Sequence, residues 1–460
     1  RRLTDAGRAR SALIVSSGVR KPPAIRPLDA WERKPVMDWQ RLDRSAVVRV
    51  VMIVLLLGVA GCRGDASRVP LPPAPPDYTR PLGPGERALR LVTDPADRPD
   101  LAGLASQLTD PAFVESLRLS AGWYDKPSSK TYFKPDVSGI SHIHAKVSAQ
   151  TLLYLAESSP TPEEAAAQID SLFDVYQTVG WNKKGVVLFT GYYSPQFTAS
   201  LERTGPYQHP LYTRPADLRS DPISGEVFGR DTGQGTTVPY YTRSEIESQS
   251  LLKGTELVYL PQRLDAYTIE VNGSAKLDLT NGETFYIGHA GTNGLNYTSI
   301  GRELIKDGKL DKNTVSMPTI RQFFLNNPDE LERYIARNDR FVFFKEYENP
   351  EQWPGGALGV RVNAMRSLAT DKEVYPPGAM VLVKTGSANR TGTMEPIVQL
   401  VFDQDAGGAI RAPGRADFYF GIGPAAESEA GKLAVEGTMY YFFLKRDLVQ
   451  GWFDQLQNDQ

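Results

Sequence analysis

Two aspartates near the C-terminus have the residue type and the setting for acid–base chemistry. An apolar run at 397–402 predicts a strand, and its period-two continuation places Asp403 and Asp405 on the same side. A second predicted strand, 416–421, carries Asp417 on the face opposite its alanine and phenylalanine side chains. We therefore expect two strands to bring carboxylates into one cleft, with Asp417 held on a rigid element.

Carboxylates that lie close together can serve as general acids near neutral pH. A negative neighbour and an apolar wall each raise the pKa of an aspartate, which then stays protonated and can donate a proton. The competing interpretation is that aspartates at strand ends are solvated turn residues or helix caps, and composition alone favours it for any single aspartate. The surrounding motifs decide between the two.

These motifs resemble a known family. The three-aspartate (3D) signature of the MltA-type lytic murein transglycosylases is similar to DAGGAIR from Asp405, GRADFYFG from Gly414 and SLATDKEVYPPG from Ser367. The family's second signature resembles FTGYYSP from Phe189. Together the motifs identify a stretch from roughly residue 90 to 446 as similar to this family.

The resemblance implies roles for the matching residues. Asp417 would be the general acid and base, and Asp405 and Asp371 would support it. Residues expected to bind the substrate are Thr190, Gly191 and Tyr192 from the second signature, Gly273 and Ser274 from a further match, and Gly291 and Asn293 from a loop rich in Gly, Asn and Tyr. The family has Val-Gln-Gly-Ser-Gly where this chain has Val-Asn-Gly-Ser-Ala at 271–275, which shortens one amide. No metal and no organic cofactor is implied.

The family's plan also implies the fold, which is mainly β with N-terminal helices. Residues 91–195 and 345–446 would form domain A, a double-psi β-barrel that carries the 3D motif. Residues 196–344 would form domain B, an inserted β domain that binds the glycan across a groove between the two. Within domain A, residues 94–180 are predicted to be mostly helical, and residues 447–460 to be a polar tail.

The N-terminal region has the features of an export signal. An apolar segment ending at Gly61 follows several arginines and is too short for a transmembrane helix, which needs roughly 20 apolar residues. The sequence Val-Ala-Gly-Cys at 59–62 resembles a bacterial lipobox, so we expect Cys62 to be lipidated and the protein to be anchored at the periplasmic face of the outer membrane. Residues 1–61 would then be the signal peptide behind an over-extended start, with Met37 as the expected initiator. The proline-rich stretch 62–90 would be a tether.

Composition excludes several other classes of protein. The 460 residues are 41% hydrophobic and 23% charged with a net charge of −2, so no basic excess indicates a nucleic-acid partner. The single cysteine, Cys62, excludes internal disulfides. With four histidines and no Gly-x-Ser-x-Gly elbow, a Ser-His-Asp hydrolase is disfavoured.

The leading functional hypothesis is therefore a peptidoglycan lytic transglycosylase. It would cleave the β-1,4 bond between N-acetylmuramic acid and N-acetylglucosamine and leave 1,6-anhydromuramic acid ends, acting in cell-wall turnover. Two alternatives stay open. One is a β-glycan hydrolase that uses two of the carboxylates, and the other is a non-catalytic lipoprotein that binds the wall.

Overall fold

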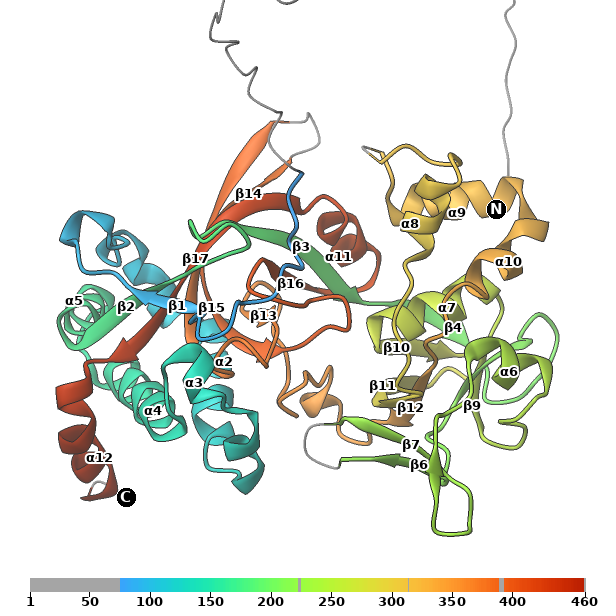
Figure 1. Ribbon diagram of the computed structural model, residues 1–460, viewed down its shortest axis with the longest axis horizontal. Helices are drawn as coiled ribbons and strands as arrows, with labels where there is room; N and C mark the ends of the chain where they lie inside the picture. The colour runs from blue at the N-terminus through green and yellow to red at the C-terminus, as the bar shows by residue number, and fades with distance from the viewer. Residues whose placement is uncertain (1–74, 222–224, 313, 389–392, 459–460) are drawn as a thin grey trace, which may run out of the picture. The chain divides into compact units, whose positions relative to one another are not determined.

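A closed circuit of strands forms the centre of the larger sheet. The structure is a computed structural model that describes residues 75–221, 225–312, 314–388 and 393–458. The sheet has the strand order β1-β2-β17-β14-β15-β13-β16-β3 (Figure 1). Its strands are β1 (Leu89–Leu91), β2 (Phe173–Thr178), β3 (Val187–Ser194), β13 (Ser367–Ala369), β14 (Met380–Ala388), β15 (Met394–Asp405), β16 (Arg415–Ile422) and β17 (Ala434–Leu444). Because β17 also pairs with β3, the chain of pairings from β3 through β16, β13, β15 and β14 to β17 returns to its start.

Strand β15 shows how sequence alternation fixes the two faces of this sheet. Leu400 and Phe402 point to the face that the helices cover, and Val401 points to the other face. All three side chains are fully buried, and each such burial contributes about 1.5–3 kcal/mol relative to an exposed position. The core that contains Val401 also includes Phe189 of β3 and Tyr441 of β17, so it fills the circuit of strands.

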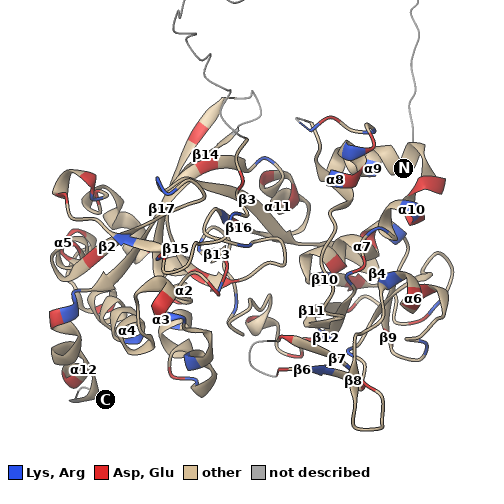
Figure 2. Cartoon of the chain, in the orientation of Figure 1, with Lys and Arg blue, Asp and Glu red and all other residues tan. Residues whose placement is uncertain are grey.

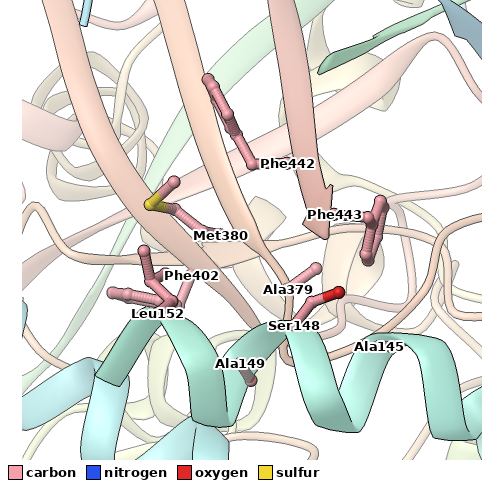
Figure 3. Close-up of a pocket in the computed structure, with 9 residues that line it drawn as sticks. All are labelled: Ala145, Ser148, Ala149, Leu152, Ala379, Met380, Phe402, Phe442 and Phe443. Carbon is pink, nitrogen blue, oxygen red and sulfur yellow. The ribbon is translucent and has the colours of Figure 1, made fainter. Parts of the chain in front are cut away.

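Helices cover the face to which Leu400 and Phe402 point. They are α2 (Pro111–Trp123), α4 (His142–Ser158), α5 (Pro162–Leu172) and α12 (Val449–Asn458). The short helix α3 (Pro135–Ser138) packs Val137 against the core that contains Val401, and α11 (Gly423–Ala430) follows β16. Side-chain caps start two of these helices: the Asp110 carboxylate accepts from the amides of Ala112 and Phe113 in α2, and the Thr161 hydroxyl accepts from the amide of Glu164 in α5. Figure 3 shows a small, mainly apolar pocket between α4 and the strands, and none of the candidate aspartates borders it.

The structure corrects three expectations about the segments that border the larger sheet: the helical region, the C-terminal tail and the tether. The helical region ends earlier than predicted, because Phe173–Thr178 is strand β2. The end of the chain is not simply a polar tail, because α12 packs its apolar side chains, Trp452 among them, against the helical core, with the Trp452 ring 5.7 Å from that of Tyr154. In the sequence, the apolar residues of α12 recur at helical spacing, which is the pattern of a helix that packs one face against a core.

The expected tether also becomes ordered before residue 90. Leu82 packs against the core, Ala88 is fully buried, and β1 starts at Leu89. Tyr78 lies against Trp181 with a ring separation of 5.8 Å and donates a 2.9 Å hydrogen bond to Glu436. Proline disfavours helices and central strands, but it does not prevent the apolar residues between prolines from packing.

Residues 196–346 form smaller sheets together with helices. A sheet of order β12-β11-β10-β4 lies beside the pair β5-β9 and the hairpin sheet β6-β7-β8. The strands are β4 (Gln196–Ala199), β5 (His209–Tyr212), β6 (Leu218–Ser220), β7 (Val227–Asp231), β8 (Thr237–Val238), β9 (Glu256–Leu260), β10 (Ser274–Leu279), β11 (Thr284–Thr292) and β12 (Val342–Glu346). The helices are α6 (Arg243–Ser248), α7 (Arg263–Asn272), α8 (Ile300–Lys306), α9 (Met317–Asn326) and α10 (Leu331–Ile335). With these helices the chain has a mixed helix-and-sheet fold, not a mainly β one.

Charged residues of both signs alternate along the helices of this region. Figure 2 shows acidic and basic residues interspersed over α8, α9 and α10. Many of them form ion pairs, such as Arg337 with Glu303 at 2.7 Å and with Asp307 at 2.7 Å. Exposed pairs of this kind contribute at most about 1 kcal/mol each.

Candidate active site

Strand β16 presents its polar side chains on one face, as its alternation predicts. Ala416 and Phe418 are fully buried in the core of the circuit, which leaves Arg415, Asp417 and Tyr419 on the opposite face. Strand β3 runs parallel to β16, and its register sets Thr190 opposite Asp417.

Asp417 has the environment of a general acid. Its side chain is half-buried, and among the described residues its Oδ1 atom is a buried acceptor without a hydrogen-bond partner. Burial raises the pKa of Asp417 to about 7; a hydrogen bond from Thr190 and the charge of Arg415 lower it, and the charge of Asp405 raises it. The carboxyl group is therefore able both to give and to take a proton near neutral pH.

The Arg415 guanidinium contacts Thr190 and acts electrostatically on Asp417. Its Nη2 atom donates to the Thr190 hydroxyl at 3.2 Å, and its Nε atom is buried without a partner in the described part of the chain. A guanidinium stays charged at physiological pH, so it favours the ionised form of Asp417. The same strand thus carries the acid and a cation that limits how far its pKa rises.

Asp405 is held in place by three donors. The Tyr192 hydroxyl donates to one carboxylate oxygen at 2.5 Å, and the amides of Ala357 and Ala406 donate to the other at 2.8 Å each. Burial raises the pKa of Asp405, while these hydrogen bonds and the charge of Lys372 lower it. Asp405 is therefore a fixed acid whose oxygens are already engaged, in contrast to Asp417.

Asp403, two residues earlier, belongs to a separate buried network. It is fully buried, forms an ion pair with Lys372, and accepts hydrogen bonds from Thr370 (2.9 and 2.7 Å) and from Tyr441 (2.8 Å). Its carboxylate is thus bonded inside the core and is not available to a substrate. Sequence reasoning missed Lys372, although it directly follows Asp371 in the first motif.

Asp371 supports the loop before β16 and not the acid itself. Its carboxylate accepts from the amides of Ala412 at 2.7 Å and Glu373 at 3.1 Å, and lies 3.8 Å from Arg411. Within the described ranges, none of its hydrogen bonds or ion pairs reaches Asp417. Its geometry fits a residue that fixes the entry of the chain into β16.

Comparisons with known proteins match both the inserted region and the region that carries Asp417. A family profile described as MltA specific insert domain matches residues 188–345, and one described as 3D domain matches residues 366–443. The chain therefore contains an MltA specific insert domain followed by a 3D domain.

Relatives of the chain carry the corresponding names. Membrane-bound lytic murein transglycosylase A of Escherichia coli (strain K12) is 31% identical over 56% of this chain and 66% of that protein, just under two thirds of its length. A crystal structure of a membrane-bound lytic murein transglycosylase from Agrobacterium tumefaciens is 26% identical, with a TM-score of 0.57 over 68% of this chain and 87% of that one. E. coli MltA with bound chitohexaose has the same fold, at 24% identity and a TM-score of 0.58 over 80% of this chain and 96% of that one.

The remaining residues expected from the MltA resemblance have mixed positions. A side chain at Gly191 would place its Cβ 2.7 Å from the Ala430 backbone and the Phe420 ring, so the close approach of α11 explains this glycine. Gly273 ends α7 with a left-handed backbone (φ 77°). Ser274 lies 3.0 Å from the Ser194 hydroxyl, which accepts from Tyr419. Ser274 is thereby connected to the Asp417 face.

The side chain of Asn293, expected to bind substrate, is engaged within the protein. Its side chain is only 2% exposed, and its amide donates to the carbonyls of Tyr241 (2.9 Å) and Asp339 (2.7 Å) while accepting from Phe341 (2.9 Å). Gly291 has φ 146° at an irregularity of β11, and a Cβ there would lie 2.6 Å from the Arg214 guanidinium. Both residues shape the backbone, and a loop rich in Gly and Asn carries no signal that separates this role from sugar binding.

Proposed function

We propose that this chain is a peptidoglycan lytic transglycosylase that cleaves the β-1,4 bond between N-acetylmuramic acid and N-acetylglucosamine. The observation that carries the proposal is Asp417, with a pKa of about 7 and a buried carboxyl oxygen that lacks a partner among the described residues. A glycosidic oxygen or a sugar hydroxyl would complete its hydrogen bonding. The murein-cleaving relatives support the choice of substrate.

In this mechanism Asp417 acts twice. Its protonated form gives a proton to the glycosidic oxygen as the bond from C1 to that oxygen breaks. The resulting carboxylate then takes the proton of the muramic acid C6 hydroxyl, whose oxygen bonds to C1 and closes the 1,6-anhydro ring. The nucleophile belongs to the substrate, so its high effective concentration replaces water.

The neighbouring groups would adjust the charge of Asp417 through the cycle. The positive Arg415 lowers the cost of the carboxylate that forms after proton donation, and the fixed negative charge of Asp405 favours reprotonation. Asp405 would also stabilise positive charge that develops at C1 in the oxocarbenium-like transition state. Tyr192 would keep Asp405 in position through its 2.5 Å hydrogen bond.

The architecture proposed for this function follows the family's plan. The closed circuit of strands would be a double-psi β-barrel, formed by the regions 91–195 and 345–446, and the inserted region 196–344 would bind the glycan opposite it. Thr190, Tyr192 and Ser274 would line the substrate side, because each is connected to the face of Asp417.

We further propose that the protein is a lipoprotein of the outer membrane, anchored through Cys62 on the periplasmic face. Cys62 lies outside the described residues, so the lipobox resemblance carries this proposal together with the membrane-bound relatives. Among the described residues, no helix combines the length and the hydrophobicity needed to cross a bilayer. Palmitate labelling of the wild type, lost in Cys62→Ala, is expected; an unlabelled wild type would contradict the anchor.

Mass analysis of the released muropeptides tests the reaction. The transglycosylase produces 1,6-anhydromuramic ends, which are lighter by one water than hydrolytic ends and resist borohydride reduction. The two-carboxylate hydrolase remains the second candidate because Asp405 lies within electrostatic reach of Asp417; it would leave reducible ends. Reducible muramic ends as the main product would refute the proposed mechanism, and binding without turnover would identify a wall-binding protein.

A further inference from the structure

Arg340 is a half-buried cation without a matching anion. Its guanidinium makes one long hydrogen bond, 3.5 Å to the carbonyl of Leu295, and no carboxylate of the described residues lies within ion-pairing distance. Burial and the positive charge of Arg411 both lower the pKa of Arg340. Removing a charge from water without pairing it costs free energy. An anion that binds from outside the chain would offset this cost, so binding at Arg340 would be favourable.

The backbone that carries Arg340 is held rigidly. The side chain of Arg243, only 1% exposed, donates to the carbonyls of Asn338 at 2.9 Å and of Arg340 at 2.6 Å. The buried Asn293 binds the same segment through its contacts with Asp339 and Phe341. Two buried side chains thus fix the backbone at 338–341, which prepares Arg340 for binding at little entropic cost.

This segment borders the loop that joins the two acid-bearing strands. A Cβ built on Gly408 would lie 3.5 Å from the Arg340 guanidinium carbon, and Gly408 belongs to the motif that begins at Asp405. Arg411 is in the same loop, and its side chain is 61% exposed. Two cations therefore adjoin the glycines that follow Asp405, one from the inserted region and one from the 3D motif.

Two further cations lie in the same neighbourhood. Arg214 donates to the carbonyls of Ala290 (3.4 Å) and Leu218 (3.0 Å) and has no carboxylate partner within the described ranges. Lys345 lies 5.2 Å from the centre of the Tyr347 ring. Burial lowers the pKa of His289, and the positive charges of Arg340, Lys345 and Arg214 lower it further. These three cations therefore lie near the same residue. Arg411 has an anion in Asp371 at 3.8 Å, whereas Arg340, Lys345 and Arg214 form no ion pair within the described residues.

We propose that Arg340, assisted by Arg411, binds a carboxylate of the peptide stem of the substrate and so makes the enzyme selective for stem-bearing glycan strands. This inference rests on the proposed function. The lactyl group of muramic acid is converted to an amide where a stem is attached, so the negative charges of such a strand are carried by the stem. A guanidinium pairs with carboxylates in a two-pronged geometry, which favours arginine for this role.

The test compares two substrates prepared from the same sacculi: intact strands, and strands stripped of their stems by an amidase. The amidase frees a lactyl carboxylate on each muramic acid, so these carboxylates are then converted to methyl amides, and the stripped strands carry no anion. We expect Arg340→Gln to lower kcat/KM on intact strands about tenfold, the usual effect of losing a charge-assisted hydrogen bond, and to change it less than about twofold on stripped strands. The kcat/KM of Arg340→Lys on intact strands should lie between those of the wild type and Arg340→Gln, because an ammonium keeps the positive charge but cannot form the two-pronged hydrogen bonds of a guanidinium. The wild-type preference for intact strands should shrink as salt is raised.

Lys253→Gln is the matched control, because Lys253 is an exposed cation of the same region and forms no ion pair within the described residues. It should leave both rates unchanged. If Arg340→Gln is unstable, Arg411→Gln takes its place, since its exposed side chain places the fold at little risk. An equal loss on intact and stripped strands would refute the stem site. A wild-type enzyme that cleaves neither substrate would instead refute the proposed function.

Discussion

Replacing Asp417 by asparagine tests the electrostatics of the site through folding stability, independently of catalysis. Burial raises the pKa of Asp417 from 3.8 to about 7, so between these pH values the folded state keeps a proton that the unfolded state has released. Because the folded state then binds more protons, the free energy of unfolding falls as the pH rises through this window. At about 1.4 kcal/mol per pKa unit, the charged carboxylate costs about 4 kcal/mol above pH 7.

Asparagine resembles the protonated form and never ionises, so Asp417→Asn should avoid this cost. We expect the variant to be more stable than the wild type at pH 8 by up to about 4 kcal/mol, with the difference shrinking towards pH 4. The measurement is urea denaturation at a series of pH values, together with muropeptide release, which the variant should lose. A variant that is no more stable at pH 8, or a difference that does not depend on pH, would refute the reasoning.

The control for this experiment is Asp403→Asn, which should have the opposite sign. Asp403 is fully buried and paired with Lys372, so neutralising it leaves a buried ammonium without its anion. Breaking a buried pair in this way costs about 3–5 kcal/mol. Asp403 and Asp417 are thus expected to respond to the same substitution in opposite directions at pH 8.

The remaining predictions concern the neighbours of Asp417. In Arg415→Gln, the pKa of Asp417 should rise, because the guanidinium lowers it, and the limb of the pH dependence of kcat/KM that reports this acid should move to higher pH. Thr190→Val removes a hydrogen bond that also lowers this pKa and should move the limb in the same direction; an unchanged profile in both variants would contradict the assignment. Gly191→Ala should destabilise the fold by about 1–3 kcal/mol in thermal denaturation, because its Cβ would meet Ala430 and Phe420 at 2.7 Å, and an unchanged Tm would show that α11 can move aside.

Much of the candidate site could be predicted from local sequence. Strand β16 alternates apolar and polar residues, which is sufficient to place Asp417 on the face opposite Phe418. The starts of α2 and α5 follow from Asp110 and Thr161, each directly before a proline in the first turn. These properties depend on residues within one turn or one strand, and the family motifs, also contiguous, added the roles that alternation cannot assign.

What the sequence by itself determined, then, is where α2 and α5 start, which face of β16 carries the acid, and which family the motifs resemble. Only the tertiary structure decided that Asp403 is neutralised by Lys372 in the core, that Asn293 supports the backbone of Arg340, and that Arg340 lacks an anion. The physical reason is that burial and pairing depend on neighbours from distant parts of the chain. The same residue type, an aspartate or an arginine, becomes a structural ion or a reactive one according to which of those neighbours reaches it.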